Sequence, residues 1–147
     1  MSGKRKEEAK RWFHQAGYDF KAAQWSMEGE FFNTACFLAQ QSAEKALKSF
    51  LYHVGARRKA LFTHSLVEMV QESGKVFDRL LDLIEDARKL DMHYIPSRYP
   101  NGLPSGTPHQ FYSKTMAKDA IDSAKRIYEA LEAYYAAQGE NEILGED

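Results

Sequence analysis

All four prolines of this 147-residue chain fall in one stretch, "DMHYIPSRYPNGLPSGTPHQFY", which runs from Asp91 to Tyr112. Proline lacks a backbone N–H and has a fixed φ, so it is excluded from helix interiors. The sequence on both sides of the stretch has helical periodicity, and structureless connections of this length are uncommon in small domains. The stretch therefore predicts a long, stiff loop that interrupts a helical protein before its last helix.

Apolar residues recur at helical spacing in five segments, which together predict the fold. These segments cover about residues 4–28, 31–54, 63–74, 76–90 and 113–135. Ser65 and Glu68 have the spacing of a capping box at the start of the third segment, and Ser113 can cap the fifth. No segment alternates with period two. The sequence thus predicts an all-α fold, an antiparallel bundle of about five helices with a long proline-rich loop before the last helix.

Composition is that of one globular domain. Hydrophobic residues make up 44% of the chain and charged residues 28%, which argues against disorder. We expect a helical domain over residues 1–136. The remaining residues, 137–147, contain no basic residue and several acidic ones, so they are expected to form a frayed tail.

The single cysteine, Cys36, lies between Ala35 and Phe37 and is interpreted as a buried small hydrophobic residue rather than a nucleophile. One cysteine cannot form an internal disulfide, which fits a cytoplasmic protein. The N-terminus has no apolar core of a signal peptide, and no apolar run is long enough to span a membrane. We therefore expect no membrane association.

Charge is unevenly distributed along the chain. Residues 1–64 hold 11 Lys and Arg against 6 Asp and Glu, whereas residues 65–147 hold 9 against 15. The basic half could meet an anionic ligand, or it could pair with the acidic half within the fold or across a dimer.

Two basic clusters could hold a phosphate. Gln41, Lys45 and Lys48 share one face of the second predicted helix, although a solvated face is the simpler interpretation. Arg58, with its neighbours Arg57 and Lys59, precedes the predicted third helix, and His64 lies in its first turn. Free N–H groups at a helix start favour anions, but a basic surface loop explains this cluster equally well.

Arg98 lies within the proline-rich stretch, between Tyr94 and Tyr99. Because proline restricts itself and the preceding residue, the segment from Ser97 to Pro100 is expected to be stiff and extended. A fixed arginine beside aromatic rings can bind a carboxylate or phosphate with two parallel hydrogen bonds. It can also act as a structural clamp, paired with an acidic residue of the bundle.

No motif of a metal or cofactor site is present. Asp91, His93 and His109 lie near the ends of the loop, but their spacing matches no strong metal motif. The chain also lacks a glycine-rich phosphate loop and the common hydrolase motifs. We expect neither a metal nor a cofactor.

Three segments taken together, "FNTACFLAQQSAEKALKSFL", "THSL" and "YIPSRYPNGLPSG", resemble the HEPN (higher eukaryotes and prokaryotes nucleotide-binding) domain family in order and spacing. The resemblance covers about residues 4–135 and is closest to stand-alone prokaryotic members, while the loop is also similar to that of the C-terminal HEPN domain of sacsin. It implies a helical homodimer that binds a nucleotide or another anionic ligand. It also implies a role beside a minimal nucleotidyltransferase, a pairing found in toxin–antitoxin systems.

The main hypothesis is therefore a non-enzymatic HEPN homodimer, which binds an anionic ligand or serves as the partner subunit of a nucleotidyltransferase. Its expected ligand-facing residues are Lys45, Lys48, Arg58, His64, Arg98 and Tyr99. A second hypothesis follows from HEPN ribonucleases, whose signature is an arginine followed after four to six residues by histidine. Arg88 and His93 match it and would act on RNA without a metal. A third is a purely structural dimerisation module.

Overall fold

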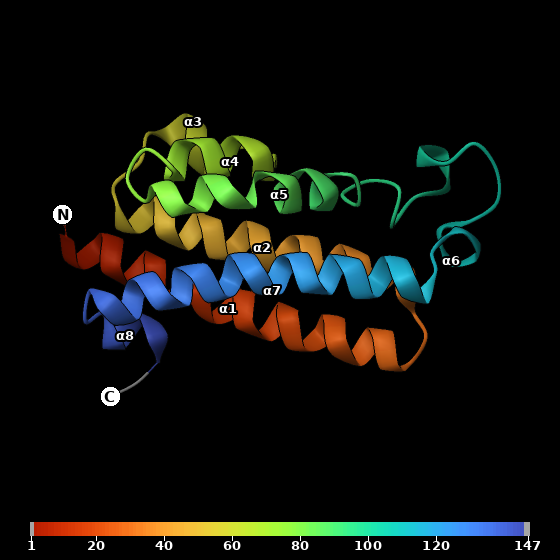
Figure 1. Cartoon of the computed structure of the whole chain (residues 1–147), viewed down its shortest axis with the longest axis horizontal. Helices are drawn as coiled ribbons and strands as arrows, with labels where there is room; N and C mark the ends of the chain where they lie inside the picture. The colour runs from red at the N-terminus through yellow and green to blue at the C-terminus, as the bar shows by residue number, and fades with distance from the viewer. Residues whose placement is uncertain (1, 146–147) are drawn as a thin grey trace.

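The structure is a computed structural model that describes residues 2–145. Three long helices, α1 (Ser2–Glu28), α2 (Phe32–His53) and α7 (Lys114–Ala137), run side by side along the molecule (Figure 1). A second layer of shorter helices, α3 to α5, covers one side of α2. No strand occurs between residues 2 and 145, so the predicted all-α fold is confirmed.

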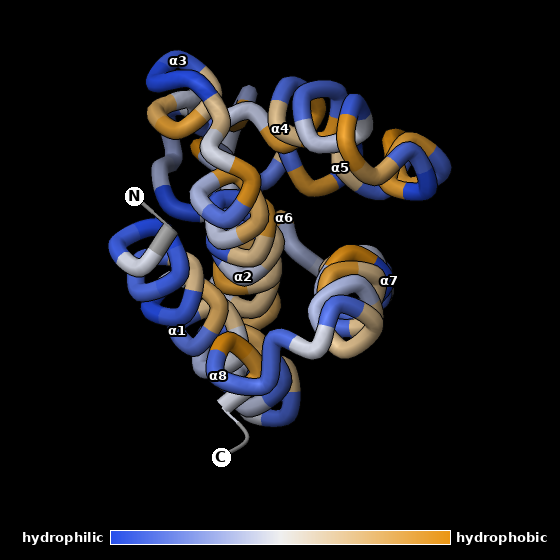
Figure 2. The backbone as a smooth tube through the Cα atoms, turned by 90° about the vertical axis from the view of Figure 1, so that its left-hand side faces the viewer, coloured by the Kyte–Doolittle hydropathy of each residue, from blue (hydrophilic) through white to orange (hydrophobic). Residues whose placement is uncertain are grey.

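Small residues let α1 and α2 approach closely. Alanines recur at helical spacing on their inner sides and are fully buried, namely Ala9, Ala16, Ala23, Ala35, Ala39, Ala43 and Ala46. Larger side chains from α7, including Ile127, Leu131 and Tyr135, complete the core. The apolar stripes of these helices turn inward, as Figure 2 shows in an end-on view. Cys36 is fully buried in this core, which confirms its interpretation as a small hydrophobic residue.

The second layer differs from the prediction in two places. The basic connection after α2 contains a short helix, α3 (Arg58–Phe62), and the predicted fourth helix begins as a 3-10 turn, η1 (Asp78–Leu83), before α5 (Ile84–Asp91). Between them, α4 (Leu66–Ser73) begins after Ser65, whose hydroxyl accepts a hydrogen bond from the Glu68 N–H at 3.2 Å. Glu68 itself binds the Thr63 hydroxyl instead of closing the capping box.

The proline-rich loop contains two short turns of helix, η2 (Pro100–Gly102) and α6 (Pro108–Phe111), and extends beyond one end of the bundle (Figure 1). Tyr99 is extended, but Arg98 lies in a turn in which its N–H donates to the Ile95 carbonyl at 3.0 Å. The expected extended backbone over residues 97–100 is therefore only partly present.

The acidic C-terminal segment, expected to be frayed, contains the helix α8 (Asn141–Leu144). Ile143 of this helix is fully buried, and α8 packs against both α1 and α7. Two adjacent apolar residues, Ile143 and Leu144, carry too little periodicity to predict such a turn. None of the helices in residues 2–145 is long and apolar enough to cross a membrane.

Candidate functional site

The beginning of α4 and the end of α5 are joined by one carboxylate. Asp91 accepts hydrogen bonds from the backbone N–H groups of Leu66, at 2.7 Å, and Val67, at 3.1 Å, and from the Ser65 hydroxyl at 3.3 Å. The first N–H groups of a helix have no acceptor within it and attract negative charge. The anion site predicted at this helix start is thus filled by the protein itself.

Three side chains stack next to this contact. The His64 imidazole lies nearly parallel to the Tyr94 ring, with centroids 5.1 Å apart, and the Arg98 guanidinium lies 4.8 Å from the same ring centroid. Tyr94 therefore contacts both of these basic side chains. We call the three residues the Tyr94 stack. The side chain of His64 is 58% exposed, so the stack is open to solvent at His64.

Arg98 is surrounded by rings rather than by acids. Phe37 and Tyr99 lie 4.4 and 4.9 Å from its guanidinium, in addition to Tyr94. Its Nε–H donates to the Tyr94 carbonyl at 2.9 Å. Among residues 2–145 no carboxylate pairs with it, so the expected ion pair with an acid of the bundle is not formed. Its two Nη groups have no hydrogen-bond acceptor in the described chain.

The two lysines of α2 are engaged within the fold. Lys48 is buried, with its ammonium 3.7 Å from the Glu44 carboxylate and 4.9 Å from the Trp12 ring centroid. Lys45 pairs with Asp19 of α1. Neither lysine lies on the solvated face that the simpler interpretation assumed, because α1 covers this side of α2.

The buried Glu44 links this face to the Tyr94 stack. Its carboxylate lies 3.4 Å from His64 Nδ1 and accepts a hydrogen bond from Gln40 at 3.2 Å. The structure thereby brings His64, Arg98 and Tyr99 together at the Tyr94 stack, with the buried Lys48 behind them, connected to His64 through Glu44. Lys45 lies beside it and borders a separate hollow of about 580 Å³, which Trp12 and Tyr18 also line.

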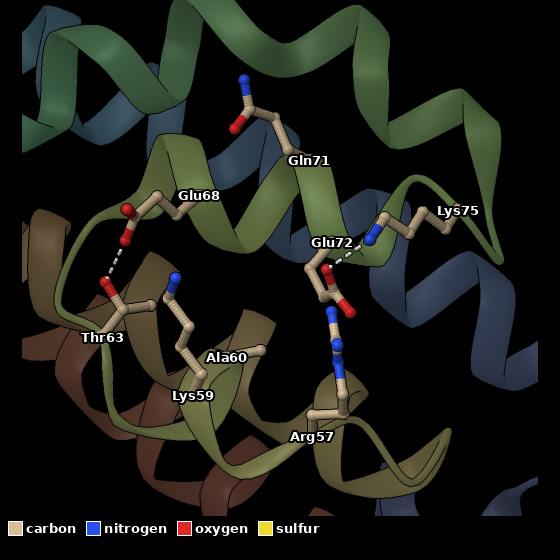
Figure 3. Close-up of a pocket in the computed structure, with 8 residues that line it drawn as sticks. All are labelled: Arg57, Lys59, Ala60, Thr63, Glu68, Gln71, Glu72 and Lys75. Carbon is tan, nitrogen blue, oxygen red and sulfur yellow. Dashed lines mark hydrogen bonds and ion pairs between the residues drawn. The ribbon is translucent and has the colours of Figure 1, made fainter.

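Arg58 is not part of this surface. Its guanidinium lies 5.2 Å from the ring of Phe62, within α3. Its neighbours Arg57 and Lys59 line a hollow of about 320 Å³ between α3 and α4, shown in Figure 3. Two glutamates face the same hollow, and Glu72 pairs with Lys75 at 2.9 Å. Mixed charges make this corner less suited to an anion than the sequence alone indicated.

Arg88 and His93 have separate partners. Arg88 pairs with Glu85 on the exposed side of α5. The His93 Nδ1 lies 3.0 Å from the Tyr112 hydroxyl, and burial lowers the pKa of this imidazole. Each side chain is thus held by a different neighbour. The described residues contain no group of His, Cys, Asp or Glu suited to a metal ion.

Sequence reasoning did not identify Phe37, Glu44 or Asp91 as contributors to this surface. Asp91 and Tyr94 flank His93 at the start of the proline-rich loop, and His64 precedes a helix start. A carboxylate at the end of one helix and a free helix start elsewhere are complementary. This complementarity could have suggested a contact between Asp91 and the start of α4. It does not identify which carboxylate meets which helix start.

Comparisons with known proteins concern the whole domain rather than this site. The chain matches the family model of the HEPN domain over residues 9–134. The crystal structure of TT1696 from Thermus thermophilus is similar, with 34% identity and a TM-score of 0.79 over 85% of this chain and 96% of that one. ST0689, described as an archaeal HEPN homologue, is 30% identical with a TM-score of 0.67 over 86% and 96%. A protein from Methanocaldococcus jannaschii, "Putative toxin MJ1304", is 26% identical over 86% of this chain and 87% of its own length.

Proposed function

The chain belongs to the HEPN family, and from this premise we propose that it is a cytoplasmic homodimer that binds a nucleotide or another anionic ligand at the Tyr94 stack. Arg98 is the residue that carries the proposal. It is held by three rings and one backbone carbonyl, while its Nη groups have no acceptor among the described residues. A preorganised arginine with free donors is suited to bidentate binding of phosphate or carboxylate.

The loop around Arg98 contributes no acidic side chain, and the two carboxylates near the Tyr94 stack, Glu44 and Asp91, are engaged by His64 and by the start of α4. Between Met92 and Tyr112 the chain has no aspartate or glutamate, so no nearby carboxylate of the loop competes with a ligand. His64 lies against the same Tyr94 ring and supplies a second donor when it is protonated. Tyr99, which is 48% exposed, offers a ring against which a base can stack. A nucleotide combines the phosphate and the base that these groups would bind.

Exposed apolar side chains around the same loop support self-association. Met92 is 70% exposed and Phe111 54%, and Phe31 at the start of α2, next to His109, is 57% exposed. We infer that these side chains contribute to a contact with another protein, since a contiguous exposed apolar patch marks such a contact. A second copy of the chain is the occupant that the family resemblance implies. Sedimentation of the purified protein would test it, with a monomer contradicting it.

A partner role is a second form of the proposal. The resemblance to prokaryotic members implies a minimal nucleotidyltransferase as the other chain. The exposed apolar residues of the loop would then contact that enzyme instead of a second copy. Co-elution of the two purified chains supports this form, and its loss in a Met92→Ser, Phe111→Ser variant would locate the contact.

The ribonuclease hypothesis is supported by one comparison, the toxin name of MJ1304. The geometry supports it less, because Arg88 is paired with Glu85 and His93 is directed toward Tyr112. Metal-free incubation with single-stranded RNA decides the matter. Cleavage by the wild type and its loss in His93→Ala would replace the binding proposal with catalysis.

Titration calorimetry with ATP tests the binding proposal. We expect saturable binding that falls at least about tenfold in Arg98→Ala, since charge-assisted hydrogen bonds contribute about 1.5–3 kcal/mol each. Arg79→Ala is the matched control, because Arg79 is an exposed arginine of η1 outside the Tyr94 stack. Equal affinities of Arg98→Ala and wild type would contradict the site. No binding by any variant would favour a structural module.

A further inference from the structure

We propose that Asp91 is a positioning residue for the Tyr94 stack, which it holds in its ligand-binding arrangement through the N-terminus of α4. This inference rests on the proposed function, because it assigns a role to Asp91 in building that site. Asp91 itself would not touch the ligand.

The contact of Asp91 is specific and directional. Its two carboxylate oxygens take different donors: Oδ1 accepts from Leu66 N–H at 2.7 Å, and Oδ2 accepts from Val67 N–H at 3.1 Å. These are the first two N–H groups of α4, which the helix cannot satisfy internally. The Ser65 hydroxyl adds a third hydrogen bond at 3.3 Å. A carboxylate here also interacts favourably with the helix dipole.

Short stretches of backbone connect this contact to the stack on both sides. His64 directly precedes Ser65, which caps α4. Tyr94 follows Asp91 by one turn, and its N–H donates to the Asp91 carbonyl at 3.4 Å. The segment from His64 to Leu66 and the segment from Asp91 to Tyr94 are therefore joined at two places. His64 stacks on Tyr94, and Asp91 binds the Leu66 N–H. If the Asp91 contact is lost, His64 is held beside Tyr94 only by the ring stacking and by its contact with Glu44.

Arg98 depends on the same turn. Its Nε–H donates to the Tyr94 carbonyl, and the Ser97 hydroxyl donates to the His93 carbonyl. The loop from Asp91 to Arg98 is thus a continuous series of local hydrogen bonds that begins at the α4 N-terminus. Asp91 ties the beginning of this loop to α4, whereas further along the loop Asn33 of α2 donates to the Ser97 carbonyl at 3.1 Å and Arg98 packs on Phe37.

Two variants and one control test this role. Asp91→Asn keeps the shape and one acceptor oxygen but removes the charge, whereas Asp91→Ala removes the contact. Asp82→Asn is the matched control, because Asp82 is an exposed carboxylate at the other end of the same segment.

Hydrogen exchange of the Leu66 and Val67 amides reports the contact, and the ring-current shifts of His64 and Tyr94 report the stack. ATP is the ligand probe.

We expect faster exchange at Leu66 and Val67 and loss of the His64–Tyr94 ring-current shifts in Asp91→Ala, with core amides of α2 still protected. ATP affinity should fall about tenfold in Asp91→Ala and less in Asp91→Asn, as for the loss of a helix cap. Asp82→Asn should match the wild type.

The role is overturned if Asp91→Ala keeps the stack, or keeps wild-type ATP affinity once the stack is lost. If Asp91→Ala does not fold, Asp91→Asn decides by the same two readouts. Failure of the proposed function is recognised separately, because the wild type itself then binds no ATP while the effect of Asp91 on the stack remains measurable.

Discussion

The guanidinium of Arg98 lies 4.4 Å from the ring centroid of Phe37, a side chain of α2 that is 61 positions earlier in the chain. This contact joins the proline-rich loop to the bundle without an ion pair. It explains why the loop combines aromatic residues with a single arginine: the rings hold the cation in place while its outer donors stay available.

Arg98 and Phe37 should therefore be energetically coupled. A double-mutant cycle of Arg98→Lys and Phe37→Leu is expected to give a coupling of about 0.5–2 kcal/mol, because lysine cannot reproduce the planar stacking of a guanidinium. Urea unfolding of the four proteins measures it. The exposed pair Lys21 and Tyr18, 5.6 Å apart, is the control and should show a coupling near zero. Similar coupling energies for both pairs would contradict a stabilising contact between Arg98 and Phe37.

His93 should make the folded state less stable in acid. Burial lowers its pKa, with Asp119 opposing the shift, so the unfolded chain binds a proton more readily than the folded protein. The free energy of unfolding should then fall as pH drops below the ordinary histidine pKa of about 6.5. His93→Asn, which keeps a partner for Tyr112, should show a shallower fall across this range. Chemical denaturation at a series of pH values measures both proteins, and parallel curves would refute the assignment.

Cys36 should be unreactive in the folded protein. Burial raises the pKa of its thiol to about 12, and the side chain is fully inaccessible. Reaction with a thiol reagent at about pH 8 should therefore proceed only through opening of the core, at a rate that increases with urea. The same reagent should react at once with the unfolded chain. Rapid labelling of the native protein would show that this part of the core is open.

The C-terminal helix α8 should contribute to stability through one side chain. Ile143→Ala is expected to lower the free energy of unfolding by about 2–4 kcal/mol, because it removes a fully buried side chain from a helix that packs on α1 and α7. Glu142→Ala, on the exposed side of the same helix, should change it by less than about 0.5 kcal/mol. Thermal unfolding compares the two. Equal effects would mean that the tail is frayed in solution.

The long helices were predictable because each carries its own apolar pattern, whereas the short helices α3, α6 and α8 carry none that is long enough. Apolar residues at helical spacing indicated both α1 and α2. Ser65 and Ser113 indicated two helix starts, and in the structure each accepts the expected backbone hydrogen bond. Each of these signals lies within or next to the helix that it predicts, so it can be read from a single sequence.

The contacts of the candidate site were less predictable, because they join distant segments. Nothing local to Asp91 indicates that its partners are Leu66 and Val67. Arg98 was expected either to face a ligand or to pair with an acid of the bundle, and neither alternative indicated that the ring of Phe37 would hold it. Lys48 was expected on a ligand-facing or solvated face, but α1 covers it with Trp12. Only tertiary packing decides which of several plausible partners a charged group meets.

The central claim is that an anionic ligand binds at Arg98, and side-chain NMR of the arginine Nε–H groups tests it most directly. The Arg98 Nε–H donates to a backbone carbonyl, so its signal should be distinct and exchange slowly. We predict that ATP shifts the signals of Arg98 and His64 while those of Arg88 and His93 stay unchanged. Shifts confined to Arg88 and His93, or to Arg57 beside the hollow of Figure 3, would contradict the account.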